Sequence, residues 1–256
     1  MNTPQKIWLI GASEGIGRAL ANTLAEEGHQ LAISARDAAR LENLVDELPG
    51  SGHMSLPLNV CQNDAVLEAW KKLDHTWGGI DLLIYCAGYY KPLNTDTMTL
   101  KEMEFMLDVN LRGAMRVICA ILPYFRLRNS GHIALIGSLA GYRGLPNSMG
   151  YGLSKAAIIH LAENLKCDLS STNITVQVIN PGFVKTRLTD LNTFKMPFLI
   201  SPEEAAQHII KTLRKRTFES HFPFIFGLIM KVLASLPYRV YFFLMKGVKN
   251  NTNDYN

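Results

Sequence analysis

Residues 11–17 read Gly11-Ala12-Ser13-Glu14-Gly15-Ile16-Gly17, between an apolar run at residues 6–10 and a helical pattern of apolar residues from Ile16 onward. A strand, a glycine-rich turn and a helix form the arrangement of a phosphate-binding loop. The first two glycines allow a tight turn and a close approach to a pyrophosphate, and the third lets the helix pack on the strand. The start of the helix adds N–H donors and the positive end of its dipole. We expect a dinucleotide here; a plain strand–helix turn is the alternative. The residues expected to contact it are Gly11, Ser13, Glu14, Gly15, Ile16 and Gly17.

The second expected strand, residues 30–36, ends in Ser34-Ala35-Arg36. A fold that binds NAD carries a carboxylate near this point for the adenosine ribose hydroxyls, and this chain has Ala35 and Arg36 instead. An arginine can pair with a 2′-phosphate, so the sequence favours NADP(H) over NAD(H). Ser34 could add a hydrogen bond to the same phosphate. The alternative is that Arg36 is an ordinary surface residue.

Expected strands alternate with helical patterns along the chain. The apolar runs that predict strands lie at residues 6–10, 30–36, 56–60 (the end of a strand), 80–85, 132–136 and 174–179. The patterns that predict helices begin at residue 16 and cover residues 64–77, 99–127, about 150–170 and 202–216. This alternation is typical of an α/β fold, a Rossmann-type doubly wound parallel sheet with helices on both faces. We expect residues 1–256 to form a single dinucleotide-binding catalytic domain.

Ligands of doubly wound sheets bind beyond the carboxyl ends of the strands. Small residues after the fourth strand let the backbone lie close to a flat ligand. The Pro-Gly turn after the sixth strand leads to a threonine whose hydroxyl could hold a carboxamide. The further residues expected to contact the cofactor are Asn59, Val60, Ala87, Gly88, Pro181, Gly182, Val184 and Thr186.

Tyr151 and Lys155 lie four residues apart, which places them on the same face of a helix. An ammonium near a phenol favours the phenolate, so Lys155 should lower the pKa of Tyr151 and make it a proton donor and acceptor near neutrality. Ser138, at the end of the fifth strand, could converge with Tyr151 on one substrate oxygen. Asn110 is flanked by apolar residues and should be buried. A satisfied structural asparagine is the common outcome there, and catalysis is the alternative.

Together these motifs make the chain resemble the short-chain dehydrogenase/reductase family, in the branch with single domains about as long as this chain. The resemblance covers about residues 5–187 and includes G-x-x-x-G-x-G, A-G after the fourth strand, an asparagine in the long helix, a serine thirteen residues before the tyrosine, Y-x-x-x-K and P-G-x-x-x-T. The sequence departs from the family at Ile10, Asn59 and Cys86, where the family usually has threonine, aspartate and asparagine. None of these departures removes a catalytic residue.

The resemblance implies a catalytic set of Asn110, Ser138, Tyr151 and Lys155, of which Tyr151 and Lys155 also contact the cofactor. In the family the tyrosine exchanges a proton with the substrate oxygen and the serine holds that oxygen. The lysine lowers the tyrosine pKa and binds the nicotinamide ribose, and the asparagine holds a water in a proton relay. The implied protein is an NADP(H)-dependent oxidoreductase that transfers a hydride between nicotinamide and a carbonyl or alcohol, usually towards carbonyl reduction. The family also implies a homodimer or homotetramer formed through two long helices.

Two other functions stay open. An NADP-binding regulatory or scaffold protein without significant turnover would be supported by loss of Tyr151 or Lys155, and both are present. Epimerases and dehydratases of nucleotide sugars also use Y-x-x-x-K, but that branch resembles G-x-x-G-x-x-G and has longer chains. This sequence has neither that glycine pattern nor that length.

Composition argues against several other classes. The net charge of +4 is mild and favours no nucleic-acid partner. The four cysteines show no C-x-x-C and the histidines no H-x-x-x-H, so we expect no metal site and free thiols in a reducing compartment. No signal peptide precedes the first strand, which favours a cytoplasmic protein.

The C-terminal third should carry a substrate-covering segment and helix, residues 188–221, with Ser201 as a helix cap, and then an apolar helical extension, residues 222–249. The extension is too interrupted for a clean membrane span, and its cations Lys231, Arg239 and Lys246 would fall roughly on one helical face. Three interpretations stay open: a cover for the substrate pocket and subunit interface, an anchor that holds the protein at the periphery of a membrane, or packing on its own core. The first two suggest a bulky, apolar, lipid- or steroid-like substrate.

Overall fold

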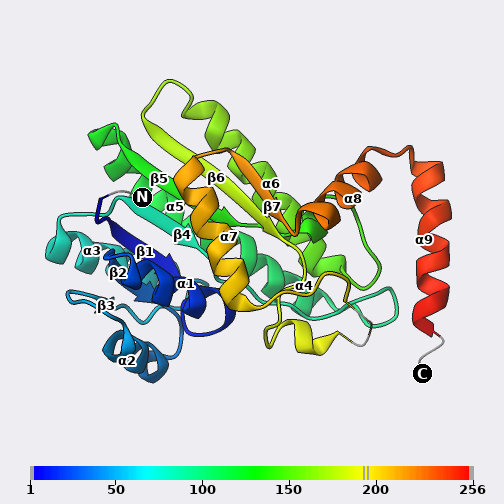
Figure 1. Cartoon of the computed structure of the whole chain (residues 1–256), viewed down its shortest axis with the longest axis horizontal. Helices are drawn as coiled ribbons and strands as arrows, with labels where there is room; N and C mark the ends of the chain where they lie inside the picture. The colour runs from blue at the N-terminus through cyan, green and yellow to red at the C-terminus, as the bar shows by residue number, and fades with distance from the viewer. Residues whose placement is uncertain (1–2, 193, 195, 254–256) are drawn as a thin grey trace.

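Seven parallel strands form one sheet in the order β3-β2-β1-β4-β5-β6-β7 (Figure 1). The computed structural model describes residues 3–192, 194 and 196–253. The strands are β1 (Lys6–Ile10), β2 (Gln30–Ser34), β3 (Met54–Ser55), β4 (Leu82–Tyr85), β5 (Gly131–Ile136), β6 (Ile174–Pro181) and β7 (Glu219–Phe222). The strand order reverses between β1 and β4, which opens a crevice at the carboxyl ends of these strands. The predicted Rossmann-type doubly wound sheet is therefore confirmed.

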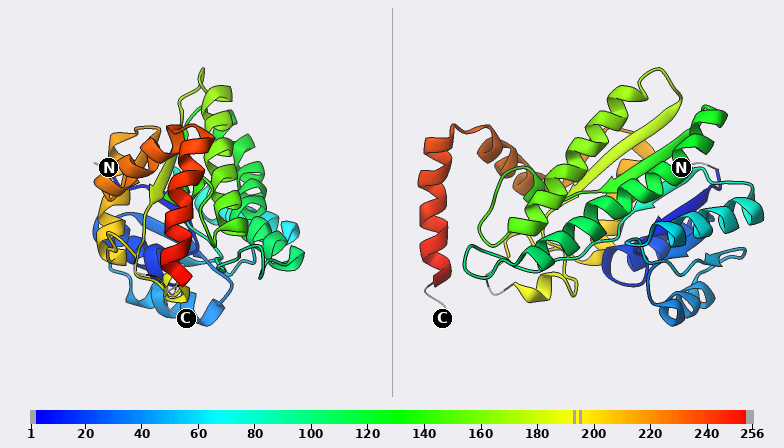
Figure 2. Two further views of the ribbon diagram at one scale, coloured as in Figure 1. Left: turned by 90° about the vertical axis from the view of Figure 1, so that its right-hand side faces the viewer. Right: turned by 180° about the vertical axis from the view of Figure 1, so that it is seen from behind.

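Helices cover both faces of the sheet (Figure 1, and Figure 2 from behind). They are α1 (Gly15–Glu26), α2 (Ala38–Glu47), α3 (Asn63–Trp77), α4 (Leu100–Leu107), α5 (Gly113–Arg128), α6 (Met149–Asp168), α7 (Pro202–Lys215), α8 (Phe224–Ser235) and α9 (Tyr238–Asn253). On one face, Leu20 of α1 and Ile209 of α7 share a core with Leu9 of β1. On the other face, Val117 of α5 shares a core with Trp8 of β1. Because neighbouring strand residues point to opposite faces, one apolar strand serves both cores.

The imidazole of His132 is buried where β5 pairs with β6. Its Nε2 lies 2.7 Å from Oε1 of Gln177, whose amide nitrogen donates to the carbonyl oxygens of Thr212 and Thr217. Burial lowers the pKa of His132 to about 4, because the charged form would lose its hydration. The side chain is therefore neutral in the folded protein at physiological pH.

We expect His132 to make the protein less stable in acid. Because its folded pKa lies below the unfolded value, its contribution is fully present above about pH 6.5 and is lost as the pH falls towards 4. Between pH 7 and 5 this loss amounts to about 2 kcal/mol in the free energy of unfolding. Urea unfolding should show a weaker pH dependence for His132→Asn than for the wild type. The exposed His160 supplies the control, His160→Asn, and an equal pH dependence in all three proteins would contradict the assignment.

Several expected boundaries differ from the structure. The third strand consists of Met54–Ser55, and residues 56–60 are not strand, although Leu56 and Leu58 still donate backbone hydrogen bonds to Ile33 and Ala35 of the β2 side. Pro57 has no N–H to extend a regular ladder. The long helix expected at residues 99–127 is divided into α4 and α5 by a π-helical turn, Asp108–Arg112. The expected cap of α7 is present, since the Ser201 hydroxyl accepts from the Glu204 N–H.

The apolar C-terminal extension is two helices, α8 and α9, that follow the short strand β7. The expectation that the three cations lie on one face of a single helix is wrong. Leu236-Pro237 separates Lys231 on α8 from Arg239 and Lys246 on α9. The right view of Figure 2 shows α9 standing beyond the layered body of the molecule. Among the helices of the described chain, none combines the length and apolar character needed to cross a membrane.

Candidate active site

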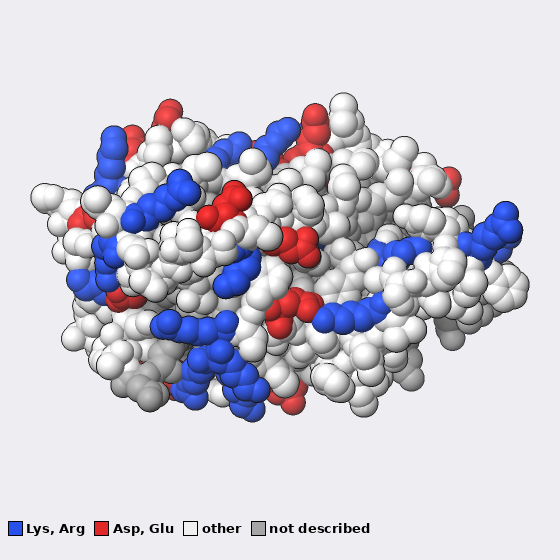
Figure 3. Space-filling model, turned by 90° about the horizontal axis from the view of Figure 1, so that it is seen from above, with Lys and Arg blue, Asp and Glu red and all other residues white. Residues whose placement is uncertain are grey.

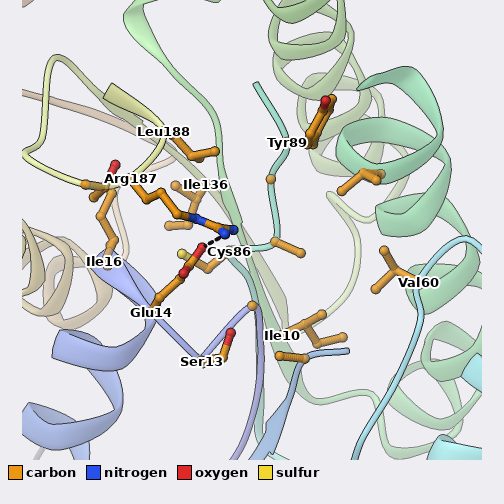
Figure 4. Close-up of a pocket in the computed structure, with 18 of the residues that line it drawn as sticks. Ile10, Ser13, Glu14, Ile16, Val60, Cys86, Tyr89, Ile136, Arg187 and Leu188 are labelled. Carbon is orange, nitrogen blue, oxygen red and sulfur yellow. Dashed lines mark ion pairs between the residues drawn. The ribbon is translucent and has the colours of Figure 1, made fainter. Parts of the chain in front are cut away.

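A cavity of about 610 Å³ lies at the carboxyl ends of the central strands (Figure 4). It extends from the β2 side of the sheet, where Arg36 lines it, to the β5 and β6 side, where Ser138 and Pro181 line it. The expected site residues that it brings together are Gly11, Ser13, Glu14, Gly15, Ile16, Gly17, Arg36, Asn59, Val60, Ala87, Gly88, Ser138, Tyr151, Lys155, Pro181, Gly182, Val184 and Thr186. Of the expected residues, Ser34 and Asn110 do not line it.

The glycine loop depends on the small size of its glycines. A Cβ on Gly11 would lie 2.5 Å from the backbone nitrogen of Ala87, and a Cβ on Gly17 would lie 1.9 Å from the carbonyl oxygen of Gly11. Glu14 is the N-cap of α1, and its side chain makes no capping hydrogen bond. The first N–H groups of α1 can therefore donate to an anion in the cavity.

Ion pairs join the glycine loop to two neighbouring segments. The Glu14 carboxylate lies 2.8 Å from Nη2 of Arg187, the pair marked in Figure 4, and 3.4 Å from Nη1 of Arg40. Arg40 and Arg187 both line the cavity, and the sequence reasoning missed them. Arg40 lies on the first turn of α2, four residues after Arg36 in the sequence, and Arg187 directly follows the threonine of P-G-x-x-x-T. The closeness of each arginine to an expected cofactor residue is the sequence feature that could have predicted its place in the cavity.

Ser34 does not reach the cavity. It is fully buried at the end of β2, and its hydroxyl accepts a hydrogen bond from Nε1 of Trp8 at 2.9 Å. Successive side chains of a strand point to opposite faces of the sheet, and Ser34 points to the face that holds Trp8. Its hydroxyl therefore cannot reach a phosphate in the cavity. The expectation that Ser34 binds a 2′-phosphate is therefore wrong.

Ser138, Tyr151 and Lys155 form the proton-transfer end of the cavity. Ser138 directly follows β5, and Tyr151 and Lys155 lie on the first turns of α6. The Ser138 hydroxyl accepts from the Ala140 N–H at 3.1 Å, and Ser138 and Tyr151 both line the cavity. The Lys155 ammonium lies 5.7 Å from the centre of the Tyr151 ring and donates to the Ile136 carbonyl at 2.8 Å. A hydroxyl, a phenol and an ammonium are thus assembled around one point.

The pKa values at this end differ from the sequence expectation. Burial raises the pKa of Tyr151 to about 12, and the neighbouring Ser138 hydroxyl only partly offsets this effect. Burial also lowers the pKa of Lys155 to about 8. The pKa of Tyr151 is therefore raised and not lowered as expected, because burial of the phenol is the dominant effect.

Asn110 lies in the π-helical turn between α4 and α5, behind the cavity wall. Its amide oxygen accepts from the Tyr89 N–H at 2.7 Å. Its amide nitrogen donates to the Tyr89 carbonyl at 3.0 Å and to the Ser154 hydroxyl at 2.8 Å. The side chain is buried and fully engaged, so it fixes the segment after β4 against α6.

We expect Asn110→Ala to destabilise the fold by about 3 kcal/mol, because it removes the hydrogen bonds of a buried amide to Tyr89 and to the buried Ser154 hydroxyl. Urea unfolding measures this change. Asn173 is exposed, so Asn173→Ala should stay within about 0.5 kcal/mol of the wild type. Equal stability of the two variants would show that the Asn110 hydrogen bonds do not support the fold.

A smaller, apolar cavity of about 120 Å³ adjoins the phenol of Tyr151. Tyr90 stands at its wall, with its ring centre 5.0 Å from that of Tyr151 and its hydroxyl donating to Asn192. Phe226 and Met230 of α8 also line it. The remaining lining residues are Ser138, Leu139, Ala140, Leu145, Pro146, Ser148, Gly182, Phe183, Leu188, Thr189 and Phe194. An apolar group can therefore lie against the proton-transfer end.

Comparison with known proteins places these features in a family. A model described as short chain dehydrogenase matches residues 5–195. The chain belongs to the short-chain dehydrogenase family. An uncharacterized oxidoreductase of Myxococcus xanthus (strain DK1622) is 35% identical over 231 residues, which cover 90% of this chain and 91% of that protein.

Two solved structures resemble this short-chain dehydrogenase. Serine dehydrogenase from Escherichia coli is 28% identical with a TM-score of 0.72, over 81% of this chain and 90% of that one. The closed form of a serine dehydrogenase complexed with NADP+ is 26% identical with a TM-score of 0.76, over 84% and 94%. The protein is therefore an oxidoreductase of the short-chain dehydrogenase/reductase type.

All three departures from the family pattern line the cavity, and two of them, Cys86 and Asn59, exchange one polar group for another. Burial raises the pKa of the Cys86 thiol to about 11, so this side chain is a neutral thiol near neutral pH. The amide oxygen of Asn59 accepts from the Cys61 N–H at 3.1 Å, which keeps the turn after residue 58 in place. Both substitutions keep the wall of the cavity uncharged at these points.

Proposed function

We propose that this short-chain dehydrogenase is NADP(H)-dependent and transfers a hydride between nicotinamide and a carbonyl or alcohol. One observation carries the proposal. A single cavity is lined by the glycine loop and Arg36 and also by Ser138, Tyr151 and Lys155. The surface that would bind a dinucleotide and the residues that would transfer a proton therefore line the same cavity.

The cavity wall fits a dinucleotide. Gly11 and Gly17 leave no room for side chains between the loop and its neighbours, and the uncapped start of α1 presents N–H donors. Thr186 lines the same cavity, so its hydroxyl is available to hold a carboxamide. The other residues that we propose for the cofactor are Ser13, Glu14, Ile16, Asn59, Val60, Ala87, Gly88, Tyr151, Lys155, Pro181, Gly182 and Val184.

When bound, the nicotinamide supplies or accepts the hydride. We propose that Tyr151 gives a proton to the substrate oxygen in reduction. Its raised pKa supports this direction, since the phenol stays protonated near neutral pH. Ser138 holds the same oxygen, and Lys155 favours the phenolate that remains after proton transfer. The amide of Asn110 is hydrogen-bonded to Tyr89 and Ser154. We therefore propose that Asn110 holds the segment after β4 in place against α6.

We propose NADP(H) over NAD(H) as the cofactor. Arg36 is exposed at the cavity and, among the described residues, pairs with no carboxylate, so its guanidinium can meet a 2′-phosphate. Arg40 lies at the same end and is paired there with Asp37 and Glu14, so Arg36 is the main candidate for the phosphate. The serine dehydrogenase of the closed form was complexed with NADP+, which agrees with this choice.

We propose a bulky, apolar substrate of lipid- or steroid-like character. The cavity beside Tyr151 supports this, because aromatic and aliphatic side chains from α8 and from residues 183–194 make up much of its wall. Such a wall stabilises a bound hydrocarbon group and offers few hydrogen-bond donors or acceptors to a polar substrate.

The test is NADPH oxidation, followed by absorbance, against carbonyls that range from small aldehydes to steroids and long-chain ketones, with NADH beside it. Turnover of the bulky apolar members is the expected result. No turnover across the panel, with tight NADPH binding, would reject the reductase and favour an NADP-binding regulatory or scaffold protein.

We also propose that the whole chain is one catalytic domain, in which residues 188–221 cover the substrate. Exposed apolar side chains such as Met115 of α5 and Leu153 of α6 support a homodimer or homotetramer through these long helices. A cytoplasmic location, with contact to a membrane through residues 222–249, completes the proposal.

A further inference from the structure

α8 and α9 expose an unusually large apolar surface. Half of the exposed large hydrophobic side chains in the described chain lie on these two helices. We call this set the tail surface, and its members are Phe224, Ile225, Leu228, Ile229, Val232, Tyr238, Val240, Phe242, Phe243 and Leu244. Apolar side chains on nearly every side of a helix are normally covered.

The tail surface is held in a defined position. Tyr241 of α9 is 2% exposed and donates a hydrogen bond to the Gly144 carbonyl. The Arg143 guanidinium lies 4.4 Å from the ring centre of Tyr238 and 4.6 Å from that of Tyr241. It also donates to the carbonyl oxygens of Ala234 and Leu236, at the junction of the two helices. A single arginine therefore fixes the angle at which both helices leave the body.

The charged residues of α8 and α9 themselves are all basic. Residues 220–253 contain Lys231, Arg239, Lys246 and Lys249 and no aspartate or glutamate. Figure 3 shows this right-hand end of the molecule as mostly uncharged atoms with blue side chains among them. Lys231 is paired with Glu219, while Arg239 and Lys246 are exposed on α9. Aromatic and aliphatic side chains beside exposed cations fit a lipid bilayer whose interior is apolar and whose headgroups are anionic.

We propose that the tail surface docks on an anionic lipid bilayer, with α8 and α9 lying in its interface. A second copy of this chain fits less well, since a two-fold contact would bring the same cations together. The helices are too short to span, so they rest at the level of the headgroups.

Docking in this way would place the apolar cavity next to lipid. On α8, the exposed positions Ile225, Ile229 and Val232 recur at helical spacing, and Phe226 and Met230 face the cavity from another side of the same helix. An apolar carbonyl dissolved in the bilayer would therefore meet the wall of the cavity first. This part of the inference rests on the proposed reductase function, whereas lipid docking does not.

Sedimentation with vesicles tests the docking directly. Full-length protein should bind phosphatidylcholine vesicles that contain about 30% phosphatidylserine at least about tenfold more tightly than vesicles of phosphatidylcholine alone. Val240→Gln with Phe243→Gln removes two exposed apolar groups and keeps the charge, and it should weaken binding about tenfold or more. Arg239→Gln with Lys246→Gln should remove the preference for phosphatidylserine. Leu127→Gln, a change at an exposed leucine on α5, should leave binding unchanged.

Each outcome has one meaning. Failure of the wild type to bind anionic vesicles, or equal binding by the Val240/Phe243 variant, would overturn the proposal. A smaller particle by light scattering for that variant, without vesicle binding by the wild type, would show that the tail surface joins copies of the chain. Vesicle binding without carbonyl reduction would leave the docking intact and reject the proposed function. Turnover of a long-chain ketone in vesicles should fall about tenfold in the same variant, while turnover of a water-soluble ketone stays constant.

Discussion

Tyr151→Phe is expected to lower the rate of NADPH-driven carbonyl reduction about a thousandfold while NADPH binding changes little. The substitution removes only the phenolic hydroxyl, which is the group that would protonate the substrate oxygen beside Ser138. The ring keeps its contacts with Tyr90 and with the Lys155 stem, so the fold of α6 should persist. Steady-state NADPH oxidation gives the rate, and quenching or transfer of NADPH fluorescence gives the dissociation constant.

Tyr90→Phe is the matched control for this prediction. Tyr90 is a second phenol at the same cavity, but its hydroxyl donates to Asn192 and points away from the proton-transfer groups. Its removal should lower the rate less than about tenfold. Wild-type turnover in Tyr151→Phe, or equal losses in both variants, would remove Tyr151 from the mechanism.

Arg36→Asp is expected to shift the ratio of kcat/KM for NADPH over that for NADH by about a hundredfold or more, towards NADH. The change removes a guanidinium that can bind a 2′-phosphate and introduces a carboxylate that repels it. The same carboxylate can accept hydrogen bonds from the two ribose hydroxyls of NADH. Initial rates with both cofactors at several concentrations give the two ratios.

Arg18→Asp makes the same charge change at a distance. Arg18 is exposed on α1, pairs with Glu47 and does not line the cavity. Its ratio should match that of the wild type. If Arg36→Asp also keeps the wild-type ratio, the 2′-phosphate must be bound elsewhere, and Arg40 would be the next residue to change.

Much of the fold was predictable because its signals are local. The glycine loop follows β1 directly, and each apolar run lies next to a turn or helical pattern that limits its length. The strand β7 was missed because Glu219, Ser220 and His221 are polar. It forms through backbone pairing with β6, and Glu219 is then satisfied by Tyr142 and Lys231. A partner so distant in sequence leaves no periodic signal.

The candidate site was predictable where residue identity alone carried the argument. Ser138 and Lys155 needed only their places at a strand end and on a helix. Ser34 was misplaced because its orientation depends on which strand face holds Trp8, and the sequence does not fix that. The raised pKa of Tyr151 could not be anticipated either, because desolvation depends on how completely the neighbouring segments enclose the phenol.

The most direct test of the central claim follows the hydride itself. NADPH that carries deuterium at both C4 positions would be incubated with the wild type and a bulky apolar ketone, and the alcohol examined by mass spectrometry. We predict one deuterium on the carbinol carbon with the wild type and almost none with Tyr151→Phe in the same time. An alcohol without deuterium, or equal labelling by both proteins, would contradict hydride transfer supported by Tyr151.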